Sequence, residues 1–188
     1  MLKFIQKGLY GLWNVWFYVL ACFGVIICLP ILIVALQRES WYRYVFWLGR
    51  NVWSPIILYG MGFWPKFSYY QKLDNNKSYM FVANHLSMID IMLMLMVVKN
   101  PFVFVGKAEL QKIPVFGFFY KRICILVDRG SQSSRKEVYF SAKRRLKNGT
   151  SVAIFPEGLV PKEDIILSPF KNGAFSLAIE HQIPIVPA

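Results

Sequence analysis

The sequence predicts an α/β fold with a mostly parallel sheet flanked by helices, preceded by an N-terminal membrane helix or helical hairpin. Two observations predict this fold class. A long uncharged apolar stretch opens the chain, and residues 65–188 alternate short apolar runs with helical patterns. Strands that alternate with helices along a chain are typical of layered domains built on a parallel sheet.

The opening apolar stretch runs from Gly8 to Leu36, 29 residues without Asp, Glu, Lys, Arg or His. A bilayer core of roughly 30 Å requires only about 20 such residues in a helix. The stretch is too long for the core of a secretory signal, so we expect the protein to keep it. A second apolar stretch follows, rich in aromatic residues but interrupted by Arg43 and Arg50. We therefore predict that residues 1–64 form a membrane anchor, either one transmembrane span or a re-entrant hairpin dipping into one leaflet.

The net charge of +12 divides into +4 on residues 1–64 and +8 on residues 65–188. A basic head beside a bilayer favours contact with anionic lipid or with an acidic soluble partner. Nucleic acid is the other common partner of basic proteins, but the sequence has no recognition motif for it, so we expect no such partner. The three cysteines lie in apolar runs without CxxC spacing or nearby His, which predicts core residues and no metal site.

Within residues 65–188, short apolar runs bounded by Gly, Pro, Asn or Asp are predicted to be buried strands. These runs are Tyr79–Ala83, Phe102–Val105, Cys124–Val127, Val152–Phe155 and Ile183–Val186. Two segments between them have a helical pattern, Ser87–Val98 and Ser134–Lys147. The second helix is predicted to open with a capping box of Ser134 and Glu137 and to end at Gly149.

The first candidate site is the sequence NHLSMID, residues 84–90, which directly follows a predicted strand. On one regular helix, His85 and Asp90 would point about 140° apart. They can meet only if His85 lies in the strand-to-helix turn and Asp90 in the first helical turn, with Ser87 as N-cap. An Asp placed there orients the imidazole and fixes its tautomer, which leaves the other nitrogen free to accept a proton. Ser87 and Asp90 also form an ordinary capping box, and the two interpretations are compatible.

Three other predicted strands also end in polar residues. Glu157 stands between Pro156 and Gly158, where a tight turn would aim the carboxylate; an ordinary turn with a solvated Glu is the alternative. Lys107 and Arg129 follow two more strands and are natural phosphate ligands, unless they are simple surface charges. A base, a carboxylate and two cations together suit a phosphate-bearing acceptor whose hydroxyl must be deprotonated. No GxSxG nucleophile motif competes with this interpretation.

These motifs resemble those of the glycerolipid acyltransferase family, and within it the bacterial 1-acyl-sn-glycerol-3-phosphate acyltransferases. Residues 84–90 match the family's NHx4D block, and the sequence FPEG at 155–158 matches its third block about 70 residues later. Segments 105–129 and 184–187 look like the second and fourth blocks. The pair NHx4D and FPEG, in this order and at this spacing, is specific to the family.

The resemblance implies that His85 removes the proton from the 2-hydroxyl of lysophosphatidic acid while Asp90 holds and charges the imidazole. The alkoxide would attack the acyl thioester directly, Arg129 would hold the acceptor phosphate, and Glu157 would line the acceptor site. The candidate substrate-binding residues are Asn84, Gly106, Lys107, Arg129, Phe155, Pro156, Glu157 and Gly158. No metal or cofactor is implied. The expected partners are a lysophospholipid, acyl-CoA or acyl carrier protein as the donor, and membrane lipid.

The sequence departs from the family pattern after FPEG, where Leu159 and Val160 replace a small hydroxyl residue and an Arg. This departure keeps open the acylation of another lysolipid, such as a lyso-aminolipid, or an idle lipid-binding scaffold. The sequence ends at Ala188, inside the fourth block, so the acyltransferase domain at 65–188 is expected to lack its C-terminal part. We expect a bacterial inner-membrane protein with its head on the cytoplasmic face, where acyl thioesters are made.

Overall fold

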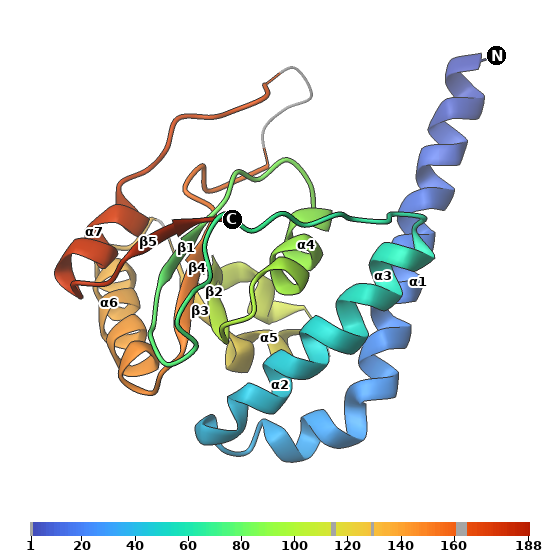
Figure 1. Ribbon diagram of the computed structural model, residues 1–188. Helices are drawn as coiled ribbons and strands as arrows, with labels where there is room; N and C mark the ends of the chain where they lie inside the picture. The colour runs from blue at the N-terminus through green and yellow to red at the C-terminus, as the bar shows by residue number, and fades with distance from the viewer. Residues whose placement is uncertain (1, 114–115, 129, 161–164) are drawn as a thin grey trace.

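The computed structural model describes residues 2–113, 116–128, 130–160 and 165–188, which form a parallel sheet flanked by helices (Figure 1). The strands are β1 Met80–Val82, β2 Phe102–Lys107, β3 Cys124–Val127, β4 Ser151–Ile154 and β5 Ile185–Pro187. They lie in the order β3-β2-β4-β1-β5, and every neighbouring pair is parallel. The predicted fold class is therefore confirmed, and the predicted strands differ from these bounds by only one or two residues.

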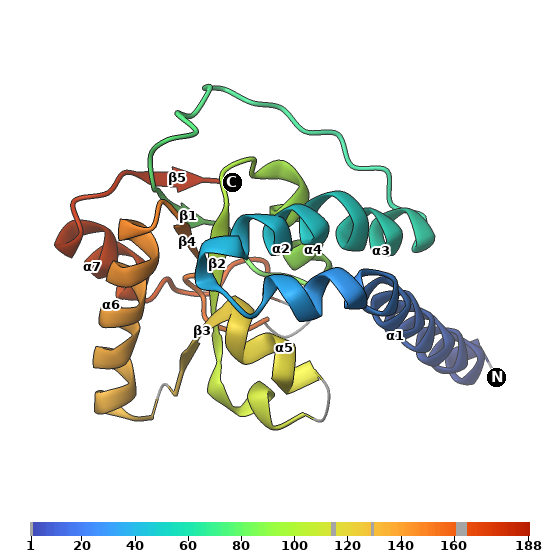
Figure 2. The ribbon, with the colours of Figure 1, turned by 90° about the horizontal axis from the view of Figure 1, so that it is seen from below.

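Helices cover both faces of the sheet (Figure 2). The helices of this part of the chain are α4 Ile89–Val97, α5 Phe116–Ile123, α6 Gln132–Lys147 and α7 Gly173–Glu180. The chain moves along the sheet from β1 through β2 to β3 and then reverses direction toward β4 and β5. Because parallel crossovers are right-handed, this reversal places α4 and α5 on one face and α6 and α7 on the other. The sequence patterns did not predict α5 or α7.

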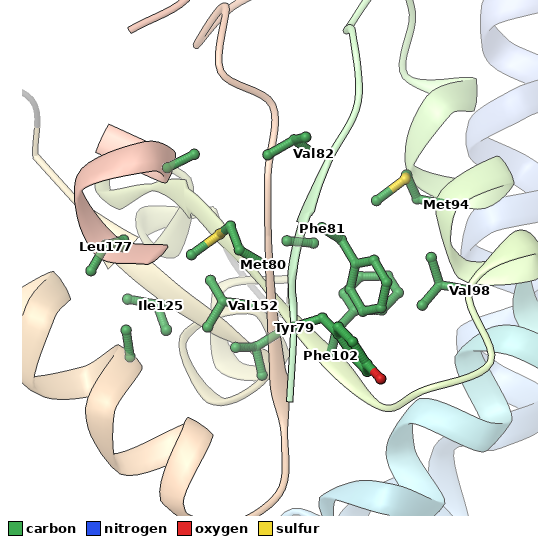
Figure 3. Packing of buried hydrophobic residues seen from close by; sticks show 14 of the residues in the cluster. Tyr79, Met80, Phe81, Val82, Met94, Val98, Phe102, Ile125, Val152 and Leu177 are labelled. Carbon is green, nitrogen blue, oxygen red and sulfur yellow. The ribbon is translucent and has the colours of Figure 1, made fainter. Parts of the chain in front are cut away.

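The core lies on both sides of the central strands (Figure 3). Phe81 of β1 and Phe102 of β2 point toward α4, and their ring centroids are 5.9 Å apart. Met80 and Val152 point to the opposite face, toward α7. Successive side chains of a strand alternate between faces, so a strand covered on both sides must be apolar throughout. This explains why β1 reads as a continuous apolar run.

Helix α4, which carries Asp90, begins later than predicted. It starts at Ile89 with Met88 as its N-cap, so the prediction of Ser87 as N-cap is wrong. The Ser87 hydroxyl still accepts a hydrogen bond from the Ile89 N–H at 3.3 Å. The serine thus belongs to the turn that precedes the helix rather than to its first position.

Helix α6 begins earlier than predicted. Its N-cap is Ser131, whose Oγ accepts a hydrogen bond from the Ser134 N–H at 3.2 Å. The predicted capping box of Ser134 and Glu137 is therefore wrong, and the Ser134 hydroxyl instead accepts from the Asp128 N–H at 2.9 Å. The predicted end is confirmed: Gly149, with a φ of +73°, follows the last turn and takes the left-handed conformation common there.

The N-terminal segment forms a helical hairpin. Its elements are α1 Leu2–Ala35, a 3₁₀ turn Glu39–Trp41, α2 Tyr42–Leu48, a π-helical turn Gly49–Trp53 and α3 Ser54–Gly60. Within the described residues, α1 is the one helix long and apolar enough to cross a membrane, with a mean hydropathy of 2.8. Two indole N–H groups join α1 to the returning helices. Trp16 donates to the Gly60 carbonyl at 2.9 Å, and Trp53 donates to the Ala21 carbonyl at 3.0 Å.

The turn of this hairpin lies against the head. Oε1 of Glu39 is 3.3 Å from Nε of Arg144 and 3.2 Å from Nε of Arg145, both on α6. The Tyr42 hydroxyl donates to the Phe102 carbonyl at 2.8 Å, and α2 side chains share the core of the sheet. The turn of the hairpin is therefore held by α6 and by the sheet. The choice between one transmembrane span and a hairpin in one leaflet stays a prediction. The N-terminal half of α1 projects away from the head, on the side of the loops that follow β1 and β4 (Figure 1).

The same hairpin fixes helix α4 in place. Met92 of α4 packs in a second apolar cluster with hairpin residues Leu20, Ile57, Leu58 and Met61. At the other end of α4, the Arg50 guanidinium donates from Nε to the Val98 carbonyl and from Nη2 to the Met96 carbonyl, both at 3.2 Å. A cation at a helix C-terminus satisfies carbonyls that lack intrahelical partners. The helix that carries Asp90 is therefore held between the sheet and the anchor.

Candidate active site

The candidate catalytic residues meet at the carboxyl ends of two neighbouring strands. His85 lies in the turn after β1, and Phe155 and Glu157 follow β4, which pairs with β1 so that Val82 lies beside Ile154. Residues 72 positions apart in the sequence thereby become neighbours. Ligand sites of parallel α/β folds lie at this edge of the sheet.

His85 and Asp90 form the contact that their spacing predicted. Nδ1 of His85 is 3.1 Å from Oδ2 of Asp90. The same carboxylate oxygen accepts hydrogen bonds from the Leu86 N–H at 2.6 Å and the Ser87 N–H at 2.7 Å. Asp90 thus holds the turn and the imidazole together, and with Nδ1–H as the donor, Nε2 is left as the acceptor.

Partial burial on its own would raise the pKa of Asp90. The hydrogen bond from His85 and those from the Ser87 and Leu86 N–H groups outweigh this effect, so the pKa lies below the ordinary value. Asp90 is therefore charged at neutral pH and carries the negative charge that would stabilise an imidazolium beside it.

Aromatic rings hold the imidazole of His85 from one side. Its ring stacks on Phe155, with centroids 4.1 Å apart and planes 12° apart, and Phe155 stacks in turn on Phe104 of β2 at 5.7 Å. The His85 side chain is 13% exposed. Of the residues that the structure describes, none forms a hydrogen bond with Nε2, so this nitrogen remains available to a hydroxyl. No pattern in the sequence marked Phe104 as a site residue, because aromatic residues are common in buried strands.

Glu157 is buried, with 2% of its surface exposed. Its Oε1 accepts from the His85 N–H at 2.8 Å, and its Oε2 accepts from the Ser168 N–H at 2.7 Å. The tight turn predicted around it is present, since Gly158 has a φ of +81° and its N–H donates to the Phe155 carbonyl at 3.0 Å. The alternative of a solvated Glu is therefore wrong. An acceptor-lining role for Glu157 stays a prediction.

One candidate phosphate ligand, Lys107, lies farther along the same edge. Lys107 ends β2, and its Nζ is 3.6 Å from Oε1 of Glu109, with both side chains exposed. Since β4 lies between β1 and β2, this position is about 10 Å from the His85 strand. Arg129 lies outside the described residues.

The other predicted substrate-binding residues surround the turn. Asn84, which precedes His85, is exposed, and Pro156, which precedes Glu157, is buried. A side chain at Gly106 would overlap the Tyr120 hydroxyl, so this glycine has a packing reason independent of any substrate. Among the described residues, no group of three or more His, Cys, Asp or Glu is arranged to hold a metal ion.

Comparisons with known proteins identify the family and the fold. A family model described as "Acyltransferase" matches residues 65–188. A 1-acyl-sn-glycerol-3-phosphate acyltransferase of coconut, Cocos nucifera, is 32% identical over 154 residues, which cover 77% of this chain and 43% of the coconut protein. The protein of that name from Escherichia coli K12 is 35% identical over 113 residues, covering 57% of this chain and 44% of that protein.

The crystal structure of the 1-acyl-sn-glycerophosphate (LPA) acyltransferase PlsC from Thermotoga maritima has the same fold. It superposes with a TM-score of 0.76 over 97% of this chain and 74% of that chain, at 22% sequence identity. The chain spans less than half the length of the coconut and E. coli relatives.

Proposed function

Because the chain belongs to the acyltransferase family, we propose that it transfers a fatty acyl group from an acyl thioester to the 2-hydroxyl of lysophosphatidic acid, forming phosphatidic acid. One observation carries this proposal: the imidazole of His85 is bound to Asp90 through Nδ1 and has no partner at Nε2 among the described residues. The coconut and E. coli relatives are named for this reaction.

The proposed reaction uses His85 as a general base. The acceptor hydroxyl gives its proton to Nε2, and the Asp90 carboxylate stabilises the imidazolium that forms. The alkoxide oxygen attacks the thioester carbonyl carbon, which creates the new C–O bond. The intermediate then collapses with cleavage of the C–S bond. The leaving thiolate takes the proton from the imidazolium, so that His85 returns to its neutral form beside the ester and the free thiol.

The acceptor phosphate would lie toward β2 and β3, where Lys107 and Arg129 follow the strands. Lys107 ends β2, two strand spacings or about 10 Å from β1, and a glycerol phosphate together with a long cationic side chain can bridge that distance. The apolar Leu159 and Val160 support a second candidate, a lysolipid with a different headgroup, because they supply no charge where related sequences carry an Arg. The donor is acyl-CoA or acyl carrier protein, and no cofactor is required.

The lipid acceptor would reach His85 from the membrane. Leu86 and Met88 in the catalytic turn, and Leu159 and Ile166 in the loop after β4, are exposed apolar residues at this edge. The N-terminal half of α1 projects past the head on the same side (Figure 1). Exposed apolar surface of this kind is typical of contacts with a protein, a ligand or a membrane, and a lipid acceptor favours the membrane. We propose that the carboxyl edge of the sheet lies at the surface of the bacterial inner membrane, on the cytoplasmic side where acyl thioesters are made.

The test is an assay of the purified chain with acyl-CoA and acyl carrier protein against a panel of lysolipids. We expect phosphatidic acid from lysophosphatidic acid, at a rate about 10²–10⁴-fold lower with the His85→Ala variant. Turnover of only a lyso-aminolipid would support the second candidate. No turnover of any lysolipid by the folded protein would favour the idle lipid-binding scaffold and refute the proposed reaction.

A further inference from the structure

We propose that Glu157 is a positioning residue. Its carboxylate joins the turn that carries His85 to the loop between β4 and α7, which it binds at Ser168. This inference rests on the proposed function only for its kinetic consequence. Its structural basis is that the two carboxylate oxygens divide their bonds between two loops, at 2.8 Å to the His85 N–H and 2.7 Å to the Ser168 N–H.

The burial of Glu157 opposes a role as an acceptor ligand. Only 2% of its surface is exposed, and each oxygen already faces a backbone donor. A substrate hydroxyl would have to displace one of these donors. The N–H group left behind would then be buried without a partner, which costs about 1–3 kcal/mol. Acceptor recognition therefore belongs to more exposed residues.

The two N–H groups need a partner of this kind because neither is part of a helix or strand ladder. His85 lies between β1 and α4, and Ser168 lies between β4 and α7. Backbone donors that are shielded from water are nearly always paired, and here one buried carboxylate pairs two partly buried ones. The Lys171 N–H donates to the Pro156 carbonyl at 2.9 Å, so the residue before Glu157 holds the same loop a second time.

The turn at the end of β4 therefore fixes His85 in two ways. Phe155 supports the imidazole face and Glu157 holds the backbone N–H of the same residue. Asp90 fixes Nδ1 independently. Loss of Glu157 would leave the imidazole paired with Asp90 while its backbone is free to shift. A misplacement of about 1 Å reduces rates by roughly a hundredfold.

The test compares wild type with Glu157→Gln, in which one oxygen becomes an NH₂ group that cannot accept a backbone N–H. Hydrogen exchange, followed by mass spectrometry of peptides containing His85 or Ser168, should accelerate at least about tenfold in at least one of the two, because the remaining amide oxygen can accept from only one of the N–H groups. In the same variant, kcat should fall roughly a hundredfold while KM for the lysolipid changes little, because the acceptor is not contacted. Glu180→Gln on the exposed surface of α7 is the matched control and should alter neither readout.

Two outcomes would overturn the proposal. Unchanged exchange in both peptides would show that Glu157 does not hold the loops, and a raised KM with unchanged kcat would make it an acceptor ligand. If Glu157→Gln does not fold, Glu157→Asp carries the test, since its shorter side chain keeps the charge but cannot span both donors. The exchange readout does not depend on activity, so failure of the proposed reaction would leave this inference testable.

Discussion

The change Asp90→Asn probes the candidate catalytic pair, because it preserves the size of the side chain and removes its charge. Oδ2 of Asp90 accepts three hydrogen bonds, at 3.1 Å from His85, 2.6 Å from Leu86 and 2.7 Å from Ser87. An asparagine carbonyl oxygen can still accept from the two backbone N–H groups. We therefore expect the turn to survive while the imidazolium loses its charged partner.

The magnitude follows from that single lost interaction. A hydrogen bond to a charged group contributes about 1.5–3 kcal/mol, and about 1.4 kcal/mol corresponds to a tenfold change in rate. The kcat of Asp90→Asn should thus fall roughly 10- to 150-fold. The assay is the initial rate of thiol release from the acyl donor at saturating lysolipid. A kcat within about twofold of wild type, in a folded variant, would mean that Asp90 serves only to hold the turn.

The same variant has an expected pH dependence of stability. The pKa of Asp90 is lower in the folded protein than its ordinary value of 3.8. Its stabilising contribution is therefore fully present above pH 3.8 and is lost as the pH falls through the folded value. The difference in melting temperature between wild type and Asp90→Asn should be constant near neutral pH and should shrink below pH 3.8. A difference that grows on acidification would contradict the assigned hydrogen bonds.

Three further changes test the base, the phosphate ligands and the anchor. His85→Ala should lower kcat by about 10²–10⁴-fold without unfolding the head, as measured by activity and thermal melting. Arg129→Ala should lower kcat/KM for phosphate acceptors by the equivalent of about 1.5–3 kcal/mol of transition-state stabilisation, and much less for a phosphate-free acceptor. Val160→Arg should raise kcat/KM for phosphate acceptors. Equal effects on both kinds of acceptor would show that these residues do not contact the acceptor phosphate. A single cysteine at Lys3 should resist an impermeant reagent outside the cell, because the chain returns along α1 as a hairpin that we expect to stay in one leaflet; labelling there would show that α1 spans the bilayer.

The part of the site that sequence could predict is the part built from local spacing. His85 and Asp90 are five residues apart, so a strand followed by a helix fixes where both side chains lie. The role of Glu157 could not be predicted in this way. Its partners are backbone N–H groups 72 and 11 residues away, and a backbone N–H has no residue type that marks it in a sequence.

The fold shows the same division between local and distant information. Strand cores were readable because burial on both faces requires continuous apolar runs. The packing of the hairpin turn against the head could not be predicted, because it depends on the contact of Glu39 with Arg144 and Arg145, which lie on a helix about a hundred residues later. The bonds from Arg50 to the end of α4 were equally hidden, since an Arg in an apolar stretch reads first as an interruption.

The strand order has a consequence for how the protein is made. β1 lies between β4 and β5, so the strand that precedes His85 gains both neighbours only after residues 151–187 have been synthesised. Contacts between distant segments form late, because a long loop must close first. The anchor and α4 can meet much earlier, as they are adjacent in the chain. During synthesis, the anchor and α4 would therefore assemble before the turn that carries His85 takes its final position. Until β4 and β5 are added, the edges of β1 stay unpaired, and unpaired strand edges are where chaperones bind and where misfolding begins.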